Sequence, residues 1–287
     1  MPPKTIGLVS DSPCDLPADI IENYAIEVVP AILVIEGQEY VDGIDLTREQ
    51  FYARLPGLRR SPSTAAPSPA AFAARYEKLL AAGCEHVISL HTSERLTSIP
   101  NFARNAARDF PGRVTVLESG SLTLGTGFQV LAAAEALAEG QGLDGALAAI
   151  RLTRENVRVA AALDTMDYVR RSGRVPAAIS AIGGLLSIKP VVELREGVVR
   201  PISAARTTRQ ANQALYNFIA SLGPLQRLSI LHSNAEARAR DFLNLLLAGE
   251  IRPAIPREIR LTNVTSLIGT HVGPNGLGFA AVINRVK

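Results

Sequence analysis

A histidine near the C-terminus has the surroundings of a ligand-binding segment. His271 stands in Ile268-Gly-Thr-His-Val-Gly-Pro-Asn-Gly-Leu-Gly278, beside the Thr270 hydroxyl and among four glycines and a proline. Glycine lets the backbone approach a ligand closely, and proline fixes the neighbouring turn. Imidazole titrates near neutrality, so this segment could hold an anion or move a proton. Taken alone, it is equally well explained as a glycine-rich turn between two strands.

Two further segments are rich in hydroxyl groups. Residues Ser61–Ser68 precede an expected helix, and residues His91–Ser98 follow a strand that is expected to end at Leu90. In open α/β sheets, ligands bind outside the carboxyl ends of the strands. Hydroxyls and helix N-termini can together bind a carboxylate or a phosphate. Ordinary caps and turns have the same composition, so each segment alone leaves both interpretations open.

The sequence lacks the motifs of common enzyme and metal sites. There is no Gly-x-Ser-x-Gly pattern, so a serine hydrolase would have to arise from residues that only folding brings together. No HExxH or Cys/His cluster predicts a metal ligand set, and Asp11 is expected to be a turn residue that caps a helix. Gly125-Thr-Gly127 lacks the third glycine of a dinucleotide fingerprint, and there is no Walker A pattern. We therefore expect no metal ion and no nucleotide cofactor.

A short basic segment offers one more candidate. Arg170, Arg171 and Arg174 lie close together beside Gly173. Such arginines could bind a phosphate or face an acidic partner. Arginines are also favoured at the C-terminal end of a solvated helix, and the spacing alone favours this second interpretation.

Composition limits the class of protein. The chain has 287 residues, of which 47% are hydrophobic and 20% charged, with a net charge of +3. This length predicts two domains with ample core. Basic runs interleaved with aromatic residues are missing, so nucleic-acid binding is not expected. Cys14 and Cys84 form no disulfide framework, the N-terminus is too polar for a signal peptide, and no apolar run is long enough to span a membrane. The sequence predicts a cytoplasmic protein.

Strands and helices alternate over the first half of the chain. Strands are expected at Ile6–Val9, Ile26–Pro30, Ala31–Ile35, Gln38–Val41, Val87–Leu90 and Val114–Leu117, and helices at Ala18–Tyr24, Pro69–Ala82, Asn101–Asp109, Phe128–Glu139 and Asp144–Val157. Glu36-Gly37 has the composition of a hairpin turn. The alternation predicts an N-terminal α/β domain, residues 1–158, with a largely parallel sheet covered by helices.

The pattern changes after residue 158. Strands are expected at Val159–Leu163, Lys189–Leu194, Val198–Ile202, Leu228–Leu231, Arg257–Val264 and Phe279–Val286, and helices at Thr165–Arg171, Ala177–Leu186, Thr208–Leu222 and Ala235–Ala248. Arg195-Glu-Gly197 would form a hairpin turn between two of these strands. We expect a second α/β domain, residues 159–287, with antiparallel strand pairing.

Short motifs occur in a fixed order along the whole chain. They are Val9–Ser12 with Asp15–Pro17, Val41–Ile44, Thr64–Pro69, Ser93–Thr97, Glu118-Ser119, Ser172–Val175, Ile188–Pro190, Arg206-Thr207 and Ile268–Pro274. In this order they resemble the DegV family, the bacterial fatty-acid-binding proteins that serve fatty acid kinase. Each motif is weak alone, and their shared order carries the resemblance.

The resemblance implies a two-domain DegV-like α/β fold that buries a long-chain fatty acid, such as palmitate, stearate or oleate, in a tunnel. It implies that the carboxylate is bound by Thr64, Thr97 and Ser98, and by His271 with its neighbour Thr270. It also implies that Arg174 acts with a separate fatty acid kinase subunit, which phosphorylates the bound carboxylate to an acyl phosphate. On this basis we expect a lipid carrier in phospholipid metabolism that is not itself an enzyme.

The chain departs from the family pattern at the expected head-group site. Thr97 and Ser98 stand where the family has serine and glycine, and Ala65-Ala66 replace a Ser-Gln pair. Ser172 replaces the first glycine of the family's Gly-Gly-Arg-Ile pattern. The hydroxyl at position 97 is kept, while the added side-chain atoms narrow the space around it.

Two other functions compete with the lipid carrier. One is a small-molecule hydrolase or a phosphotransferase that uses His271, and the other is a regulatory module that senses acyl chains. Binding of fatty acid without turnover would separate the carrier from the enzymes. The partner that is recovered, a kinase subunit or a transcription factor, would separate the carrier from the regulator.

Overall fold

The computed structural model describes residues 5–172 and 188–284, which form two compact units. Residues 1–32 and 65–155 make up the N-terminal unit, and residues 33–64 and 156–287 the C-terminal unit. The sequence placed residues 33–64 in the first domain. They group with the second unit because helix α2, Arg48–Arg54, contacts helix α11, Ser266–Val272, and the Arg48 guanidinium donates to the Asn263 carbonyl oxygen.

A parallel sheet forms the centre of the N-terminal unit, as the sequence predicted. Its strand order is β2-β1-β6-β7, with β1 Ile6–Asp11, β2 Glu27–Val29, β6 His86–His91 and β7 Val114–Glu118. All three strand pairs are parallel. The chain leaves β1 for β2 on one side and returns to β6 on the other. The topological switch point therefore lies between β1 and β6.

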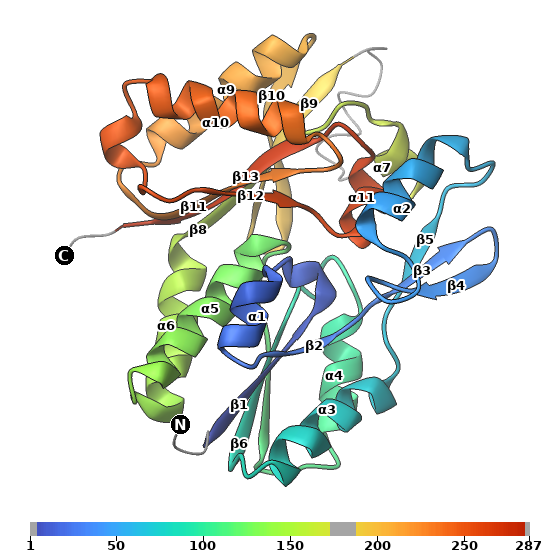
Figure 1. Cartoon of the computed structure of the whole chain (residues 1–287), viewed down its shortest axis with the longest axis vertical. Helices are drawn as coiled ribbons and strands as arrows, with labels where there is room; N and C mark the ends of the chain where they lie inside the picture. The colour runs from blue at the N-terminus through green and yellow to red at the C-terminus, as the bar shows by residue number, and fades with distance from the viewer. Residues whose placement is uncertain (1–4, 173–187, 285–287) are drawn as a thin grey trace. The chain divides into compact units, whose positions relative to one another are not determined.

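Helices cover both faces of this sheet (Figure 1). They are α1 Ala18–Asn23, α3 Pro69–Ala81, α4 Ile99–Ala107, α5 Leu124–Ala138 and α6 Gly142–Asn156. Helix α5 starts four residues before the predicted Phe128. The Gly125-Thr-Gly127 segment belongs to its first turn, where a Cβ on Gly127 would stand 2.6 Å from the Cys14 carbonyl oxygen. Close packing, rather than a loop, explains this glycine.

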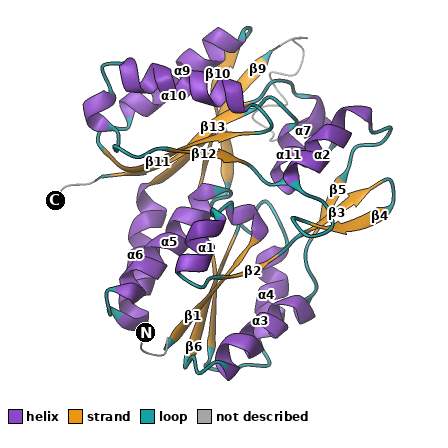
Figure 2. Ribbon diagram, viewed as in Figure 1, coloured by secondary structure: helices purple, strands orange, loops and turns teal. Residues whose placement is uncertain are grey.

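The larger sheet of the C-terminal unit is mainly antiparallel (Figure 2). Its order is β10-β9-β8-β13-β11-β12, with β8 Val157–Ala162, β9 Lys189–Arg195, β10 Val198–Ala205, β11 Leu225–His232, β12 Arg260–Asn263 and β13 Leu277–Ile283. Only β11 and β12 pair in parallel among these strands. The predicted antiparallel pairing is confirmed.

The helices of the C-terminal unit include α2 and α11, together with α7 Asp167–Arg171, α9 Thr208–Ser221 and α10 Glu236–Ala248. A small sheet of order β4-β3-β5 adds β3 Ile32–Ile35, β4 Gln38–Val41 and β5 Ser63–Ala65. Short 3-10 turns lie at Ser12–Cys14, Leu55–Gly57 and Arg252–Ala254. A buried aromatic and aliphatic cluster that includes Phe242 and Phe279 forms the core beneath α9 and α10.

Both predicted hairpin turns are confirmed. Glu36 and Gly37 join β3 to β4, and Glu196 and Gly197 join β9 to β10, all four with positive φ angles. Two consecutive positive φ angles match the type I′ turn, whose twist suits a two-residue hairpin. The predicted helix at Ala177–Leu186 lies outside the described residues.

Segment 268–278 is not the continuous loop that its glycines suggested. Helix α11 runs through Gly269 and His271 and ends before Gly273, and β13 begins at Leu277. Helix α2 was not expected from the sequence. Its start carries a capping box in which the Thr47 hydroxyl accepts from the Gln50 backbone N–H and the Gln50 side chain accepts from the Thr47 N–H. This Thr-x-x-Gln spacing is a recognised helix-start signal.

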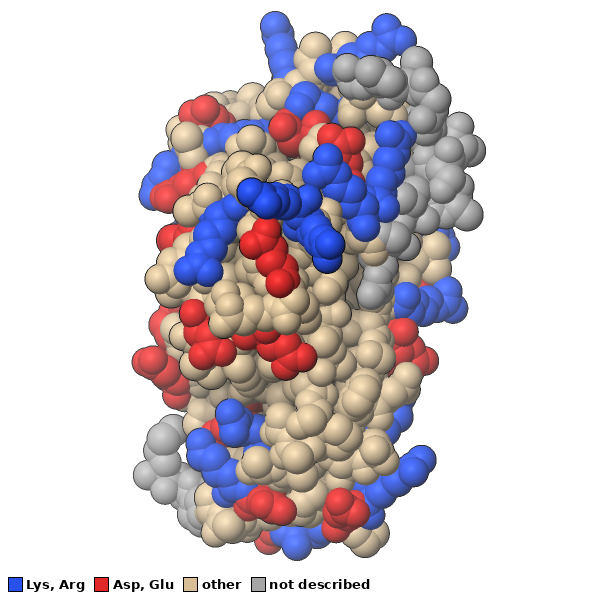
Figure 3. Space-filling model, turned by 90° about the vertical axis from the view of Figure 1, so that its right-hand side faces the viewer, with Lys and Arg blue, Asp and Glu red and all other residues tan. Residues whose placement is uncertain are grey.

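Charged side chains of both signs mix on the face drawn in Figure 3. Exposed ion pairs such as Arg240–Glu236 and Arg104–Glu94 occur among the described residues. Pairs of this kind contribute at most about 1 kcal/mol each, so burial of apolar surface remains the main stabilising term. Among the helices that the structure describes, none is long and apolar enough to cross a membrane.

Candidate functional site

The C-terminal unit brings together two of the predicted site residues. The Thr64 hydroxyl, on β5, lies 3.4 Å from Nε2 of His271, on α11, although 207 positions separate them in the sequence. Both side chains are partly exposed. A hydroxyl and an imidazole at this spacing can both donate to one anionic oxygen-bearing group.

Thr270 contributes differently from its neighbour. Its side chain is 1% exposed, and its hydroxyl donates to the Ser266 carbonyl oxygen at 2.9 Å within α11. A threonine hydroxyl commonly donates to the carbonyl one turn earlier in a helix. This contact explains Thr270 as a part of the helix that holds His271.

Thr97 and Ser98 belong to the N-terminal unit, in the segment between β6 and α4. The Thr97 backbone N–H donates to the Ser93 carbonyl oxygen at 3.2 Å, and the Thr97 hydroxyl accepts from the Ile99 N–H at 3.3 Å. Ser98 is exposed directly before α4. These contacts are those of a turn that opens a helix. That Thr97 and Ser98 bind the same ligand as Thr64 and His271 stays a prediction.

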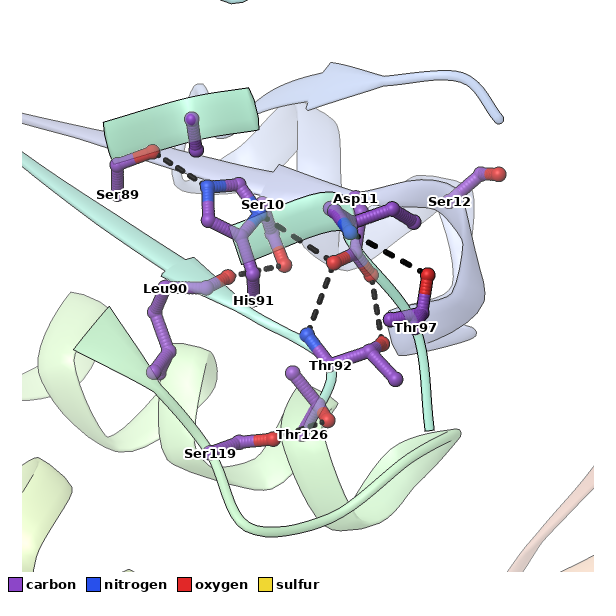
Figure 4. Close-up of polar contacts among 12 residues, drawn as sticks. Ser10, Asp11, Ser12, Ser89, Leu90, His91, Thr92, Thr97, Ser119 and Thr126 are labelled. Atoms are coloured by element: carbon purple, nitrogen blue, oxygen red, sulfur yellow. Dashed lines mark hydrogen bonds and ion pairs between the residues drawn. The ribbon is translucent and has the colours of Figure 1, made fainter. Parts of the chain in front are cut away.

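The predicted role of Asp11 as a helix cap is wrong. Asp11 is the last residue of β1, is fully buried, and makes no cap hydrogen bond to the following turn. Its carboxylate accepts the Thr92 backbone N–H at 2.8 Å and the Thr92 hydroxyl at 2.9 Å (Figure 4). It thereby ties the carboxyl end of β1 to the segment that follows β6. The polar pair Ser10-Asp11 at the end of an apolar strand was the available signal.

A buried chain of polar groups continues from Asp11 through the sheet. Nδ1 of His91 lies 3.3 Å from the Asp11 carboxylate, and Nε2 lies 2.6 Å from the Ser89 hydroxyl (Figure 4). The Ser89 hydroxyl lies 2.8 Å from that of Tyr76. Burial raises the pKa of Tyr76 to about 12, which keeps this hydroxyl neutral.

Ser89, His91 and Asp11 follow one another in the order of a Ser–His–Asp triad, but none of the three side chains is accessible to solvent. A hydrolytic serine must reach a substrate carbonyl, whereas Ser89, His91 and Asp11 are each fully buried. The Ser89 hydroxyl is also shared with Tyr76 inside the core. The arrangement therefore joins strands and helix α3 as an internal polar network and offers no exposed nucleophile.

The carboxyl ends of β1, β6 and β7 gather further polar groups. Ser119 follows β7, and its hydroxyl lies 2.8 Å from that of Thr126 on α5. Burial alone would raise the pKa of Glu118, but hydrogen bonds from Arg154 and the Gly120 N–H lower it overall. The segment His91–Ser98 begins at the carboxyl end of β6, as the sequence predicted. The sheet order places this end beside the switch point, where α/β folds bind ligands.

Two further predictions concern a kinase-interaction residue and a metal site. Arg174, the proposed kinase-interaction residue, lies outside the described residues. Among the residues that are described, no group of three or more His, Cys, Asp or Glu side chains could hold a metal ion.

Comparison with known proteins gives consistent matches. The DegV family model, described as "Uncharacterised protein, DegV family", matches residues 5–284. DegV domain-containing proteins of Streptomyces coelicolor and Deinococcus radiodurans are each 31% identical to this chain. They cover 96% of it and 97% and 98% of their own lengths.

Solved structures share the fold. A Thermus thermophilus structure described as "Fatty Acid Binding of a DegV family Protein" superposes with a TM-score of 0.89 at 33% identity, covering 97% of this chain and 99% of its own. Bacillus subtilis DegV, described as a fatty acid binding protein, gives 0.85 at 26% identity, covering 98% and 99%. The predicted two-domain α/β fold class is thus confirmed. With a family model that spans nearly its full length and relatives that match end to end, the chain belongs to the DegV family.

Proposed function

We propose that this protein binds a long-chain fatty acid and that the Thr64–His271 pair binds its carboxylate. The observation that carries the proposal is the 3.4 Å approach of the Thr64 hydroxyl to His271 Nε2 in a member of a family whose solved structures are described as fatty-acid-binding. The hydroxyl and the imidazole come from separate elements and face each other. Two such groups suit an oxygen-rich head group better than an apolar one.

The energetics favour an acyl chain with a neutral or cationic donor set at its head. Each buried methylene contributes about 0.8 kcal/mol, so a chain of palmitate length supplies most of the binding free energy. The carboxylate must replace its lost hydration with hydrogen bonds. Thr64 can donate one, and His271 can donate another from Nε2 when that nitrogen carries a proton. The ligand would be fatty acid, with no cofactor.

We propose further that the bound carboxylate is presented to a separate fatty acid kinase, which forms the acyl phosphate. Thr64 and His271 then hold the acceptor rather than attack it. The burial of Ser89 supports a carrier over a hydrolase that uses the Asp11–His91 network. Thr97 and Ser98 remain proposed carboxylate ligands, Thr270 a proposed neighbour of the site, and Arg174 the proposed kinase-interaction residue.

Ligand extraction tests the central proposal. Protein purified without added lipid is denatured, and the extract is analysed by mass spectrometry for palmitate, stearate and oleate. We expect a fatty acid in near-stoichiometric amount, or uptake of labelled palmitate or oleate by delipidated protein. Protein that carries no acyl chain and takes up neither probe would overturn the proposal.

The enzymatic alternative has its own signature. A phosphotransferase would form phosphohistidine at His271 with a phosphoryl donor, and a hydrolase would turn over esters in a His271-dependent way. We expect neither in the absence of the kinase. Incubation with labelled ATP and with a chromogenic ester, comparing wild type and His271→Ala, distinguishes the two functions.

A further inference from the structure

Helix α11, which carries His271, contacts both α2 and α7 in the C-terminal unit (Figure 1). Two glycines flank His271, each two residues away. Gly269 is inside the helix, and Gly273 directly follows it. Both are buried, and each faces a tyrosine from a neighbouring helix.

Tyr52, on α2, covers the first glycine. A Cβ on Gly269 would stand 2.5 Å from the Tyr52 hydroxyl oxygen and 2.8 Å from two ring carbons. Real Cβ atoms do not approach other atoms so closely, so only glycine permits this contact. Tyr52 is itself 1% exposed, its hydroxyl donates to the Val264 carbonyl oxygen at 3.3 Å, and its ring packs edge-on against Phe51.

Tyr168, on α7, covers the second glycine. Gly273 has a φ of 73°, and a Cβ there would stand only 2.2 Å from a carbon atom of the Tyr168 ring. A positive φ already favours glycine, so this position has two independent reasons for lacking a side chain. Beside it, Val272 packs against the buried cluster of Leu163, Met166 and Val169.

We propose that Tyr52 and Tyr168 are positioning residues that fix the axial and rotational placement of α11 and so hold the His271 imidazole at Thr64. The two rings contact bare backbone on either side of the histidine, where a helix seven residues long has little stability of its own. A helix can rotate or slide when such contacts are lost, and a shift of about 1 Å is enough to spoil a hydrogen-bond geometry. This inference rests on the proposed role of His271 in carboxylate binding.

The test compares a free fatty acid with its methyl ester. Both have the same acyl chain, but only the acid presents a carboxylate, so the ratio of their affinities reports on the head group. Wild type, Tyr52→Ala, Tyr52→Phe, Tyr168→Ala and Gly269→Ala are delipidated and titrated with palmitate and methyl palmitate. Gly57→Ala is the matched control, because a Cβ at that position meets no side chain or backbone outside its own turn within 4 Å.

We expect Tyr52→Ala, Tyr168→Ala and Gly269→Ala each to reduce the acid-to-ester preference by about tenfold, the loss of one charge-assisted hydrogen bond. Tyr52→Phe keeps the ring on Gly269 and should keep most of the preference, and Gly57→Ala should keep all of it. In a His271→Ala background, Tyr52→Ala and Tyr168→Ala should reduce the preference no further. A purely structural role would weaken acid and ester equally.

The outcomes separate this inference from the function on which it rests. If His271→Ala lowers the acid-to-ester preference but none of the tyrosine variants does, the positioning role is overturned and the head-group assignment stands. If His271→Ala leaves the preference unchanged, the head-group assignment itself fails, and the positioning inference fails with it. Should Gly269→Ala not fold, the two tyrosine-to-alanine variants decide, since they remove atoms without introducing a clash.

Discussion

The carboxylate of Asp11 accepts both the backbone N–H and the side-chain hydroxyl of Thr92, a residue 81 positions away. A fully buried carboxylate needs such partners to offset the loss of its hydration. The two contacts join the ends of adjacent parallel strands at the switch point of the N-terminal sheet. They also fix the start of the segment that leads to Thr97 and Ser98.

Removing the Asp11 carboxylate should therefore destabilise the N-terminal unit more than removing the Thr92 hydroxyl. Thr92→Val keeps the backbone hydrogen bond and should cost about 1.5–3 kcal/mol, as for one hydrogen bond to a charged group. Asp11→Ala leaves the Thr92 N–H, the Thr92 hydroxyl and His91 without their carboxylate. It should cost about 3–5 kcal/mol, because each unsatisfied buried donor costs about 1–3 kcal/mol. Urea unfolding followed by circular dichroism measures both. A smaller loss for Asp11→Ala than for Thr92→Val would contradict this account.

Substitutions at the Thr64–His271 pair should weaken head-group binding without unfolding the chain. Thr64→Val and His271→Ala each remove one donor and should weaken palmitate binding about tenfold, corresponding to about 1.4 kcal/mol. Thr64→Ser keeps the hydroxyl and is the matched control. Isothermal titration with delipidated protein provides the affinities, and thermal unfolding provides the check on folding. Unchanged affinity in both Thr64→Val and His271→Ala would remove these residues from the proposed site.

Thr97 requires a parallel measurement because it lies in the other unit. If Thr97 binds the same carboxylate, Thr97→Val should lower affinity for palmitate and not for methyl palmitate, and the double variant with Thr64→Val should show non-additive losses. A helix-opening role alone predicts a stability loss with an unchanged acid-to-ester preference. Ser98→Gly restores the family residue and should leave the Thr97 contacts intact.

Arg174 is expected to separate lipid binding from turnover. We propose that Arg174, in the Ser172-Gly-Arg-Val175 segment, acts with the kinase, because an arginine can pair with a transferring phosphoryl group. Arg174→Ala should therefore keep its palmitate affinity and lose at least about tenfold in kinase-dependent acyl phosphate formation. Arg171→Ala is a neighbouring charge control. Normal turnover by Arg174→Ala would reject the assignment.

Cys14 should resist thiol reagents in the folded protein. Burial, reinforced by the negative charge of Asp11, raises the pKa of the Cys14 thiol to about 12, so very little thiolate forms near pH 8. The side chain is also only 1% exposed. Iodoacetamide at pH 8 should label Cys14 only after urea is added, as peptide mapping would reveal. Rapid labelling of native protein at Cys14 would show that the loop after β1 opens readily.

Local patterns predicted the elements better than they predicted the contacts between them. Glu36-Gly37 and Glu196-Gly197 were identified correctly because a type I′ turn depends on the residues within it. The glycine-rich sequence around α11 suggested a loop, but Gly269 is needed for contact with Tyr52, more than 200 positions away. The buried role of Asp11 was hidden for the same reason, since its partner Thr92 lies 81 positions away, in the segment that follows β6. The prediction that Thr64 and His271 belong to one site came from the family resemblance and not from their spacing in the sequence.

His232 provides a pH-dependent test of the C-terminal unit. Burial lowers the pKa of His232 below its ordinary value of 6.5, while the charge of Glu236 partly opposes this shift. Its Nδ1 accepts the Ala235 backbone N–H at 3.2 Å, which requires that nitrogen to be unprotonated. Well above pH 6.5, His232 is neutral in both the folded and the unfolded states and contributes almost no pH dependence. Below pH 6.5, the unfolded chain binds the proton first, so stability is lost as the pH falls toward the folded-state pKa.

His232→Asn removes this titration while its side-chain oxygen can still accept from Ala235. The free energy of unfolding of wild type should therefore fall more steeply than that of His232→Asn between pH 6.5 and pH 5, and the two proteins should run parallel from pH 7 to pH 8. The difference between the two curves isolates His232, because every other side chain is the same in both proteins. Parallel curves across the whole range would show that protonation of His232 does not oppose folding.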